Sequence, residues 1–185
     1  MFIDVCFPNK NEEKFIEVAK KLKTDGLIFV YNKSNDSKYK FNTFQAQLNK
    51  YEKNKIIISN ELVPNYTKKN NIIFYYNGLK DEKKNFFQPL KNVNQVFFKQ
   101  IKNKPFGISF SYLINNSYKD DIFEKYKYLI TLGQKYNVKL FISSFAKTPF
   151  ELRSKNELSA IFSLLKIKSN FQKNSFSILD NFLNK

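Results

Sequence analysis

Residues 138–162, VKLFISSFAKTPFELRSKNELSAIF, predict a strand, a polar turn and a helix in direct succession. The predicted strand, Val138 to Ser143, is mostly apolar, and serine residues with hydroxyl groups stand at its end. The helix follows a capping box made by Ser154 and Glu157, and it then places apolar residues at helical spacing. A buried strand followed by a capped helix is the repeating unit of parallel α/β folds.

The remainder of the chain repeats this alternation of short apolar runs and helix-like segments. Further strands are predicted at Phe2 to Phe7, Leu27 to Tyr31, Ile56 to Ser59, Ile72 to Tyr76, Val93 to Phe98 and Phe106 to Phe110, with a weaker eighth strand at Ser169 to Phe171. Further helices are predicted at Asn11 to Lys23, Phe41 to Lys53, Tyr118 to Tyr136 and about Phe176 to Leu183. Strands and helices in this order imply βαβ units.

Seven or eight parallel strands predict a TIM-barrel-like (β/α) barrel, shortened, with residues 1–185 forming a single domain. The chain has 185 residues, and such barrels usually need about 250. We therefore expect shortened helices or loops between Asn60 and Lys91, and an exposed loop at Lys33 to Lys40. An open doubly wound sheet is the structural alternative.

The charge of the chain indicates a polyanionic partner. It carries 32 basic against 16 acidic residues, a formal net charge of +16. Codon bias of an A/T-rich genome accounts for lysine in place of arginine, but less well for the two-to-one excess of bases. Self-repulsion of this size favours binding to nucleic acid over binding to a membrane surface. The single cysteine, Cys6, and the lack of any membrane-length apolar run lead us to expect a soluble cytoplasmic protein, with Cys6 as a small core residue.

The composition excludes several catalytic classes. The chain contains no histidine and only four glycines, which removes Ser-His and Cys-His nucleophile pairs, two-histidine zinc sites and glycine-rich phosphate loops. We therefore expect no catalytic residue, no cofactor and no metal ligand in the protein. A carboxylate-only Mg²⁺ phosphoesterase remains the enzymatic alternative, with Asp4, Glu61 and Glu151 as its candidate ligands.

Two regions join basic residues to strand ends, and both are candidate RNA-binding sites. In the first, Lys99, Lys102 and Lys104 lie between two predicted strands. In the second, Ser143, Ser144 and Lys147 precede Arg153, the only arginine of the chain. Hydroxyl groups, a helix N-terminus and a planar guanidinium all suit phosphate oxygens. The alternatives are a solvated connecting loop for the first region and, for Arg153, a structural ion pair with Glu151 or Asp4.

The second region also resembles a known family, ribonuclease P protein component 3. The likeness rests on a strand that ends in two serines, a Leu-Arg-Ser turn and the helix after it. Weaker likenesses lie in the opening strand with its aspartate, in the segment after the sixth strand and in the closing helix. These matching segments are Tyr136 to Ala146, Glu151 to Ser154, Asn156 to Ile161, Phe2 to Val5, Phe110 to Leu113 and Ser175 to Asn181. The chain departs from the pattern at Phe145, where glycine is usual, at Gly107 or Ile108, where a glutamate is usual, and at Ser177, where proline is usual.

This resemblance implies a TIM-barrel-like fold and a subunit that does not itself catalyse the reaction. It implies that ribonuclease P RNA is the catalyst and carries the Mg²⁺, and that the protein pairs with ribonuclease P protein component 2 to brace that RNA. Precursor tRNA would then be an indirect partner, and removal of its 5′ leader the reaction served. An RNA-binding module unrelated to ribonuclease P is the third reading of the sequence.

Overall fold

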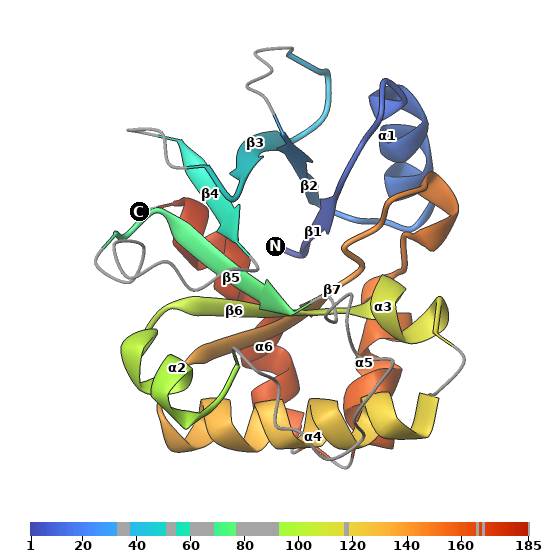
Figure 1. The fold of residues 1–185 in the computed structure, drawn as a ribbon. Helices are drawn as coiled ribbons and strands as arrows, with labels where there is room; N and C mark the ends of the chain where they lie inside the picture. The colour runs from blue at the N-terminus through green and yellow to red at the C-terminus, as the bar shows by residue number, and fades with distance from the viewer. Residues whose placement is uncertain are drawn as a thin grey trace.

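Seven parallel strands form a nearly closed barrel in the computed structural model of the chain (Figure 1). The structure describes residues 1–32, 38–50, 55–59, 69–76, 93–116, 119–165, 167 and 169–184. The strands are β1 (Ile3–Cys6), β2 (Gly26–Tyr31), β3 (Thr43–Leu48), β4 (Ile56–Ser59), β5 (Ile72–Tyr76), β6 (Pro105–Ser109) and β7 (Lys139–Ser143). Each strand pairs in parallel with the next one along the chain. The predicted (β/α) barrel is therefore confirmed.

Among the described residues, five helices pack outside the strands, and the last helix packs against β7 and β1 and contributes to the apolar interior of the barrel. They are α1 (Glu12–Lys21), α2 (Gln95–Gln100), α3 (Phe110–Ile114), α4 (Lys119–Lys135), α5 (Lys155–Leu164) and α6 (Ser169–Leu183), with a 3-10 turn η2 (Pro149–Glu151) before α5. In Figure 1, α1 lies beside β1 and β2, and α4 runs along the lower edge of the molecule. No helix in the described part of the chain has both the length and the apolar character that crossing a bilayer requires.

The barrel has an apolar interior and two outer apolar layers. Every second residue along a strand faces the barrel interior, because successive side chains of a strand point to opposite faces of the sheet. The interior cluster contains Ile3, Val5, Ile28, Val30, Ala46, Ile58, Ile73, Tyr75, Phe141, Phe145 and Leu179. Cys6 belongs instead to the outer layer under α1, where burial raises the pKa of its thiol. Its predicted role as a small core residue is confirmed.

The seam between the first and the last strand is closed in two different ways. At the carboxyl ends of the strands, Phe7 N donates to Ala146 O at 2.8 Å, and Ala146 N donates to Val5 O at 3.1 Å. Away from these bonds, α6 packs against both β7 and β1. The barrel is thus sealed by main-chain hydrogen bonds at one end and by a helix at the other.

Three sequence predictions of secondary structure are wrong. Residues 41–53 were expected to be helical, but Thr43–Leu48 forms β3, whose Phe44, Ala46 and Leu48 pack toward the barrel interior. Val93 to Phe98 was expected as a strand, but Gln95–Gln100 is helix α2, capped by the side chain of Asn94. The eighth strand at Ser169 to Phe171 is instead the first turn of α6. Tertiary packing decides short apolar runs of this kind, because they fit either period.

Two predicted regions lie largely outside the described residues. Of the expected loop at Lys33 to Lys40, the structure describes only residues 38–40, which contain neither helix nor strand. Between Asn60 and Lys91 it describes residues 69–76, which include β5. The expected shortened helices or loops of that region therefore remain a prediction.

Candidate nucleic-acid interface

The two predicted basic regions lie at opposite ends of the barrel. Ser143, Ser144, Lys147 and Arg153 follow the carboxyl end of β7. The lysines of the other region, Lys99, Lys102 and Lys104, belong to α2 and to the turn that enters the amino end of β6. In a parallel barrel these two ends face opposite directions. The structure therefore does not bring the seven predicted residues into one site.

At the carboxyl end, the two serines serve the barrel seam. Both side chains are fully buried. The Ser143 hydroxyl donates to Asp4 Oδ1, and the same oxygen accepts Ser144 N–H at 2.7 Å and Val5 N–H at 2.9 Å. Ser144 Oγ in turn accepts Arg153 N–H at 3.0 Å. Phosphate binding by Ser143 and Ser144 stays a prediction, and their burial does not favour it.

Asp4 is the centre of this seam. Burial is the main effect on its carboxyl group and raises its pKa, although the bonds from Ser143, Ser144 and Val5 oppose the rise. Its second oxygen, Oδ2, has no hydrogen-bond partner within the described residues. Because its acceptor Oδ1 is surrounded by donors of β1 and β7, Asp4 connects the first strand to the last.

Arg153 is held by the turn that precedes α5. Its Nη1 donates to the carbonyl oxygens of Phe150 and Leu152, each at 2.7 Å, and its guanidinium lies 5.4 Å from the centre of the Phe110 ring. Its Nε lies 3.9 Å from Glu157 Oε1. A structural ion pair with Glu151 or Asp4 was the alternative interpretation of Arg153. The guanidinium is instead paired, at 3.9 Å, with Glu157. RNA contact by the exposed part of this side chain stays a prediction.

Acidic groups balance the cations of this end. Glu151 accepts from Lys147 N at 2.7 Å, Ser111 Oγ at 2.9 Å and Asn115 Nδ2 at 3.1 Å. Burial opposes ionisation of this carboxyl, but these hydrogen bonds prevail and lower its pKa. The carboxylates of Glu151 and Glu157 thus lie beside Lys147 and Arg153, so the charges of these four residues balance, two against two.

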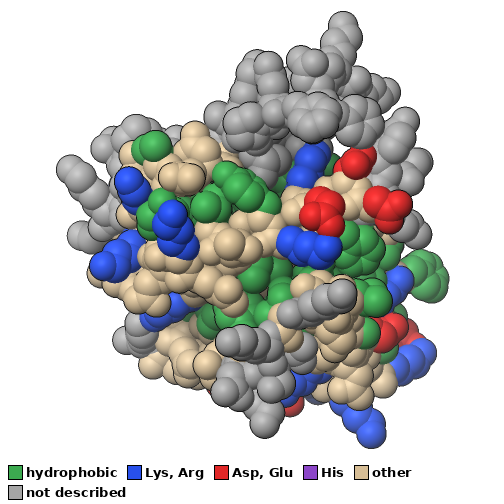
Figure 2. All heavy atoms as spheres, turned by 90° about the horizontal axis from the view of Figure 1, so that it is seen from below, with side chains coloured by type: hydrophobic (Ala, Val, Ile, Leu, Met, Phe, Trp, Pro, Cys, Tyr) green, Lys and Arg blue, Asp and Glu red, His purple; other side chains and the backbone are tan. Residues whose placement is uncertain are grey.

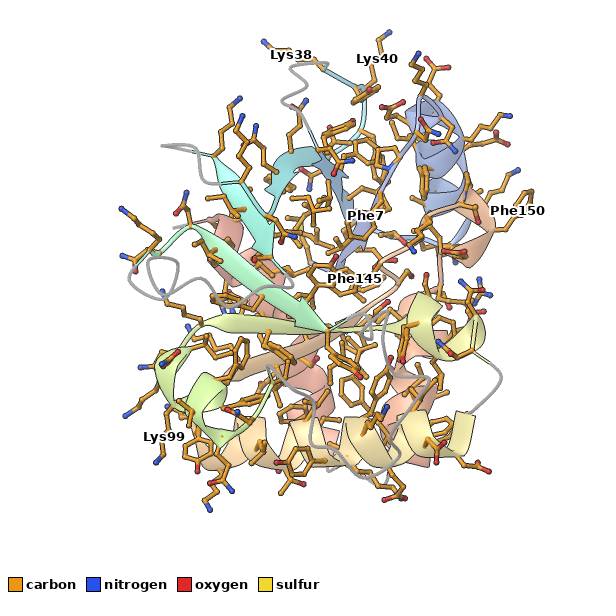
Figure 3. All side chains as sticks on the ribbon, viewed as in Figure 1. Phe7, Lys38, Lys40, Lys99, Phe145 and Phe150 are labelled. Atoms are coloured by element: carbon orange, nitrogen blue, oxygen red, sulfur yellow. The ribbon has the colours of Figure 1, made fainter. Side chains whose placement is uncertain are left out.

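An aromatic stack fills the carboxyl-end mouth of the barrel. The Phe145 ring is fully buried and stacks on Tyr75 with ring centres 4.9 Å apart and planes 12° apart. The ring centre of Phe141 lies 6.0 Å from that of Phe145, and the ring centre of Phe7 lies 6.4 Å from it. Figure 3 labels Phe7 and Phe145 in the barrel interior, whereas the exposed Phe150 points outward. Because enzymes of this fold build their sites at this mouth, the stack occupies the usual place of a substrate.

The two described carboxylates that were named as magnesium ligands, Asp4 and Glu151, each accept hydrogen bonds from protein groups. Asp4 is held in the seam, Glu151 binds Ser111 and Asn115, and Glu61 lies outside the described residues. Within the described part of the chain, no three Asp, Glu, Cys or His side chains come close enough to share a metal ion.

On the side formed by α2, β6, α4 and β7, the amino end of the barrel carries lysines that no acidic residue of these segments balances. The chain has no Asp or Glu from residue 83 to 119, or from 125 to 150, and these stretches supply α2, β6, most of α4 and β7. The ammonium groups of Lys99 and Lys135 lie 5.9 Å and 5.7 Å from the centre of the same ring, Tyr136. Burial lowers the pKa of Lys104, whose ammonium donates to Lys69 O. Lys102 is exposed.

The view from below shows this asymmetry directly. In Figure 2 one group of basic side chains lies along the left edge with no acidic side chain visible beside it, whereas other basic side chains, toward the centre and right of the face, have acidic ones near them. Figure 3, viewed as in Figure 1, labels Lys99 on the left side of the molecule, beside α2. We call the group Lys99, Lys102, Lys104, Lys135 and Lys139 the amino-end lysine cluster.

Sequence reasoning missed the part of this cluster that comes from α4 and β7. Lys135 and Tyr136 meet Lys99 through the packing of α2 on α4, a contact that no local pattern announces. The signal available in the sequence was the acid-free stretch from residue 125 to 150.

Comparison with known proteins identifies the fold. No known protein-family pattern and no curated protein matches the sequence. A chain in a cryo-EM structure of archaeal ribonuclease P with mature tRNA superposes with a TM-score of 0.76, over 98% of this chain and 90% of that one. The two share one fold. Their sequences are 16% identical, so the similarity to that ribonuclease P chain establishes the architecture and leaves the activity to be argued from the residues.

Proposed function

We propose that this protein is a non-catalytic subunit of a ribonuclease P, which binds the catalytic RNA and stabilises it for removal of the 5′ leader of precursor tRNA. The single observation that carries the proposal is the amino-end lysine cluster, an unbalanced cationic surface, on a barrel shared with a chain of archaeal ribonuclease P. Each ammonium group neutralises RNA phosphates and releases condensed counterions, which is the main source of affinity for RNA.

The chemistry of cleavage is assigned to the RNA in this proposal. Mg²⁺ held by the RNA would supply the activated water, and the lysines of the protein lower the repulsion between RNA segments that must lie close together. The filled mouth of the barrel and the dispersed carboxylates of the described residues support this division of labour. Ribonuclease P protein component 2 is the proposed protein partner, in line with the family that the sequence resembles.

The first experiment identifies the RNA. The protein is purified from its own cells, the RNA that copurifies is sequenced, and cleavage of precursor tRNA is measured with that RNA in the presence and absence of the protein. We expect ribonuclease P RNA and a lower Mg²⁺ requirement when the protein is present. A different RNA, or phosphodiester cleavage by the protein alone, contradicts the proposal.

The second experiment tests whether the amino-end lysine cluster is the surface that binds RNA. We expect log Kd for the RNA to depend steeply on log salt concentration, and Lys99→Gln with Lys102→Gln to reduce the slope by about 0.7 to 0.9 for each phosphate contact removed. Lys20→Gln with Lys21→Gln on α1 serves as the matched control, since it removes the same charge from another face. Equal slopes for the two double variants would place the RNA elsewhere.

A further inference from the structure

A cleft opens between the amino ends of β4 to β7 and helix α6. Its volume is about 850 Å³, within the range of about 300 to 1,000 Å³ that is typical of small-ligand sites. Among the described residues, its wall is unusually rich in side-chain amides and contains no carboxylate. The amides belong to Asn70, Asn71, Asn103, Asn137, Asn174 and Asn181.

Three of these asparagines have a structural role, in a left-handed turn or in a hydrogen bond to another part of the chain. Asn103 and Asn137 adopt φ angles of 64° and 55°, a left-handed conformation that asparagine tolerates better than most residues. Asn137 Nδ2 donates to Asn103 Oδ1 at 3.1 Å, and Asn71 donates to Lys55 O. The side-chain amides of Asn174 and Asn181, both on α6, make no hydrogen bond within the described residues, and they face solvent at the cleft.

The buried hydroxyl group of Ser175 has no structural role that the described residues reveal. It lines the cleft at 1% exposure, and its Oγ has no hydrogen-bond partner among the described residues. A buried hydroxyl without a partner costs stability, because it has given up its bonds to water. A polar ligand in the cleft would supply the missing bond.

The other groups in the wall define the chemistry of that ligand. Lys104 and Lys139 enter from the strand ends, and Phe171 and Phe182 enter from α6. Ammonium groups suit a phosphate, amides and a hydroxyl suit the donors and acceptors of a base edge, and aromatic rings suit the face of a base. The lysines Lys99, Lys102 and Lys135 extend the same charge beyond the cleft.

We propose that this cleft binds one unstacked, single-stranded nucleotide of the partner RNA. The proposal rests on the proposed function, and it adds to the phosphate contacts of the lysine cluster a site that reads a base. Phosphate contacts position a protein on RNA without distinguishing sequences, whereas contacts to base edges distinguish them. A preference for one unpaired nucleotide is therefore the property that the cleft confers.

The test uses Ser175→Ala in the full-length chain. The probes are single-stranded oligoribonucleotides of about ten residues of A, C, G or U alone, and a duplex of the same length. We expect the wild type to prefer a single strand of one composition. Ser175→Ala should lose roughly fivefold in affinity for that strand, keep the same salt slope, and raise the melting temperature of the free protein, because it removes the unpartnered hydroxyl.

A second variant and a control guard against an indirect effect. Asn181→Ala lies on the exposed side of the cleft and should lower the affinity for the preferred strand without changing the fold. Asn156→Ala, an exposed asparagine on α5 outside the cleft, should leave affinity unchanged. Changes in the NMR chemical shifts of Ser175 and Asn181 on addition of the preferred oligonucleotide, with no change at Asn156, would add direct support.

The outcomes separate the two proposals. If the wild type binds RNA but both cleft variants bind every strand as it does, the cleft site is overturned and the lysine cluster stands. The same holds if the four compositions bind equally well. If the wild type binds none of the probes and no folded RNA at low salt, the proposed function itself fails.

Discussion

A Cβ atom at Gly107 would lie 2.5 Å from Cζ of Phe145, so the Phe145 ring occupies the space that any larger residue at position 107 would need. In the strand register Gly107 lies between Tyr75 of β5 and Phe141 of β7. Phe145 stacks on both of these rings. The missing side chain on β6 thus makes the gap into which the ring packs.

We predict that Gly107→Ala destabilises the protein by about 1 to 3 kcal/mol, because overpacking a filled core forces neighbouring groups to move. Urea unfolding followed by circular dichroism measures the change. The loss should shrink when Phe145→Leu is combined with Gly107→Ala, since the shorter side chain leaves room for the methyl group. Equal losses in the two backgrounds would show that the ring and the glycine are not coupled.

The second prediction concerns Asp4 and pH. Burial raises its pKa in the folded protein above the ordinary value of 3.8, so the folded state binds this proton more tightly than the unfolded state does. Its contribution to stability is therefore fully present below the ordinary pKa and is lost as pH rises through the folded pKa. Asp4→Asn, which keeps an acceptor at Oδ1, should flatten the fall of melting temperature over that pH range.

Asp4→Ala is the contrasting variant for the same site. It leaves the Ser143 hydroxyl and the Ser144 N–H without their acceptor at the barrel seam. We expect a loss of about 2 to 4 kcal/mol at neutral pH, because unpaired buried donors cost more than the bond itself contributes. A pH profile of Asp4→Asn that matches the wild type would assign the pH dependence to other groups.

The third prediction concerns Arg153. Arg153→Ala should weaken RNA binding or reconstituted cleavage, and it should also loosen the turn, because Nη1 donates to both Phe150 O and Leu152 O. Arg153→Lys keeps the charge but cannot reproduce the planar guanidinium. RNA affinity preserved in the lysine variant alone would assign the contribution to charge. Full affinity and cleavage in a folded Arg153→Ala protein would leave the residue a purely structural role.

The fourth prediction tests the helix start that the sequence indicated. Ser154 Oγ accepts Glu157 N–H at 3.3 Å, and Glu157 Oε2 accepts Ser154 N–H at 2.7 Å. Ser154→Ala should cost about 1 kcal/mol in thermal or urea unfolding, because it leaves a helix donor without a partner. Ser159→Ala, in the middle of α5, is the control and should change stability by less than half as much.

Strands with a strong apolar run and a defined helix start could be predicted from the sequence. Residues 72–76 form a strand as expected, and the capping box at Ser154 opens α5 as expected. The predictions for short segments were wrong where the apolar residues fit both the helical period and the two-residue period of a strand. Phe41, Phe44 and Leu48 suit a helix, but Phe44, Ala46 and Leu48 also alternate, and pairing with β2 and β4 favours the strand.

The candidate site was harder to predict, because its residues meet only in the fold. Ser143 and Ser144 carry groups that suit phosphate, and only the barrel seam shows that Asp4 uses them. Phe145 stands where the resembled family has glycine, and its φ of 46° is the left-handed conformation that glycine adopts most easily. The departure kept the backbone turn and placed a ring in the barrel mouth.

The seam also determines when β1 can complete its pairing during synthesis of the chain. The free edge of β1 pairs with residues 143–146, so these main-chain groups of β1 stay unpaired in a growing chain until residues 143–146 have been synthesised. An exposed strand edge invites pairing with other chains, and contacts between distant residues form slowly. Nascent chains that stall before Ala146 are therefore the species that we expect to need chaperones and to aggregate.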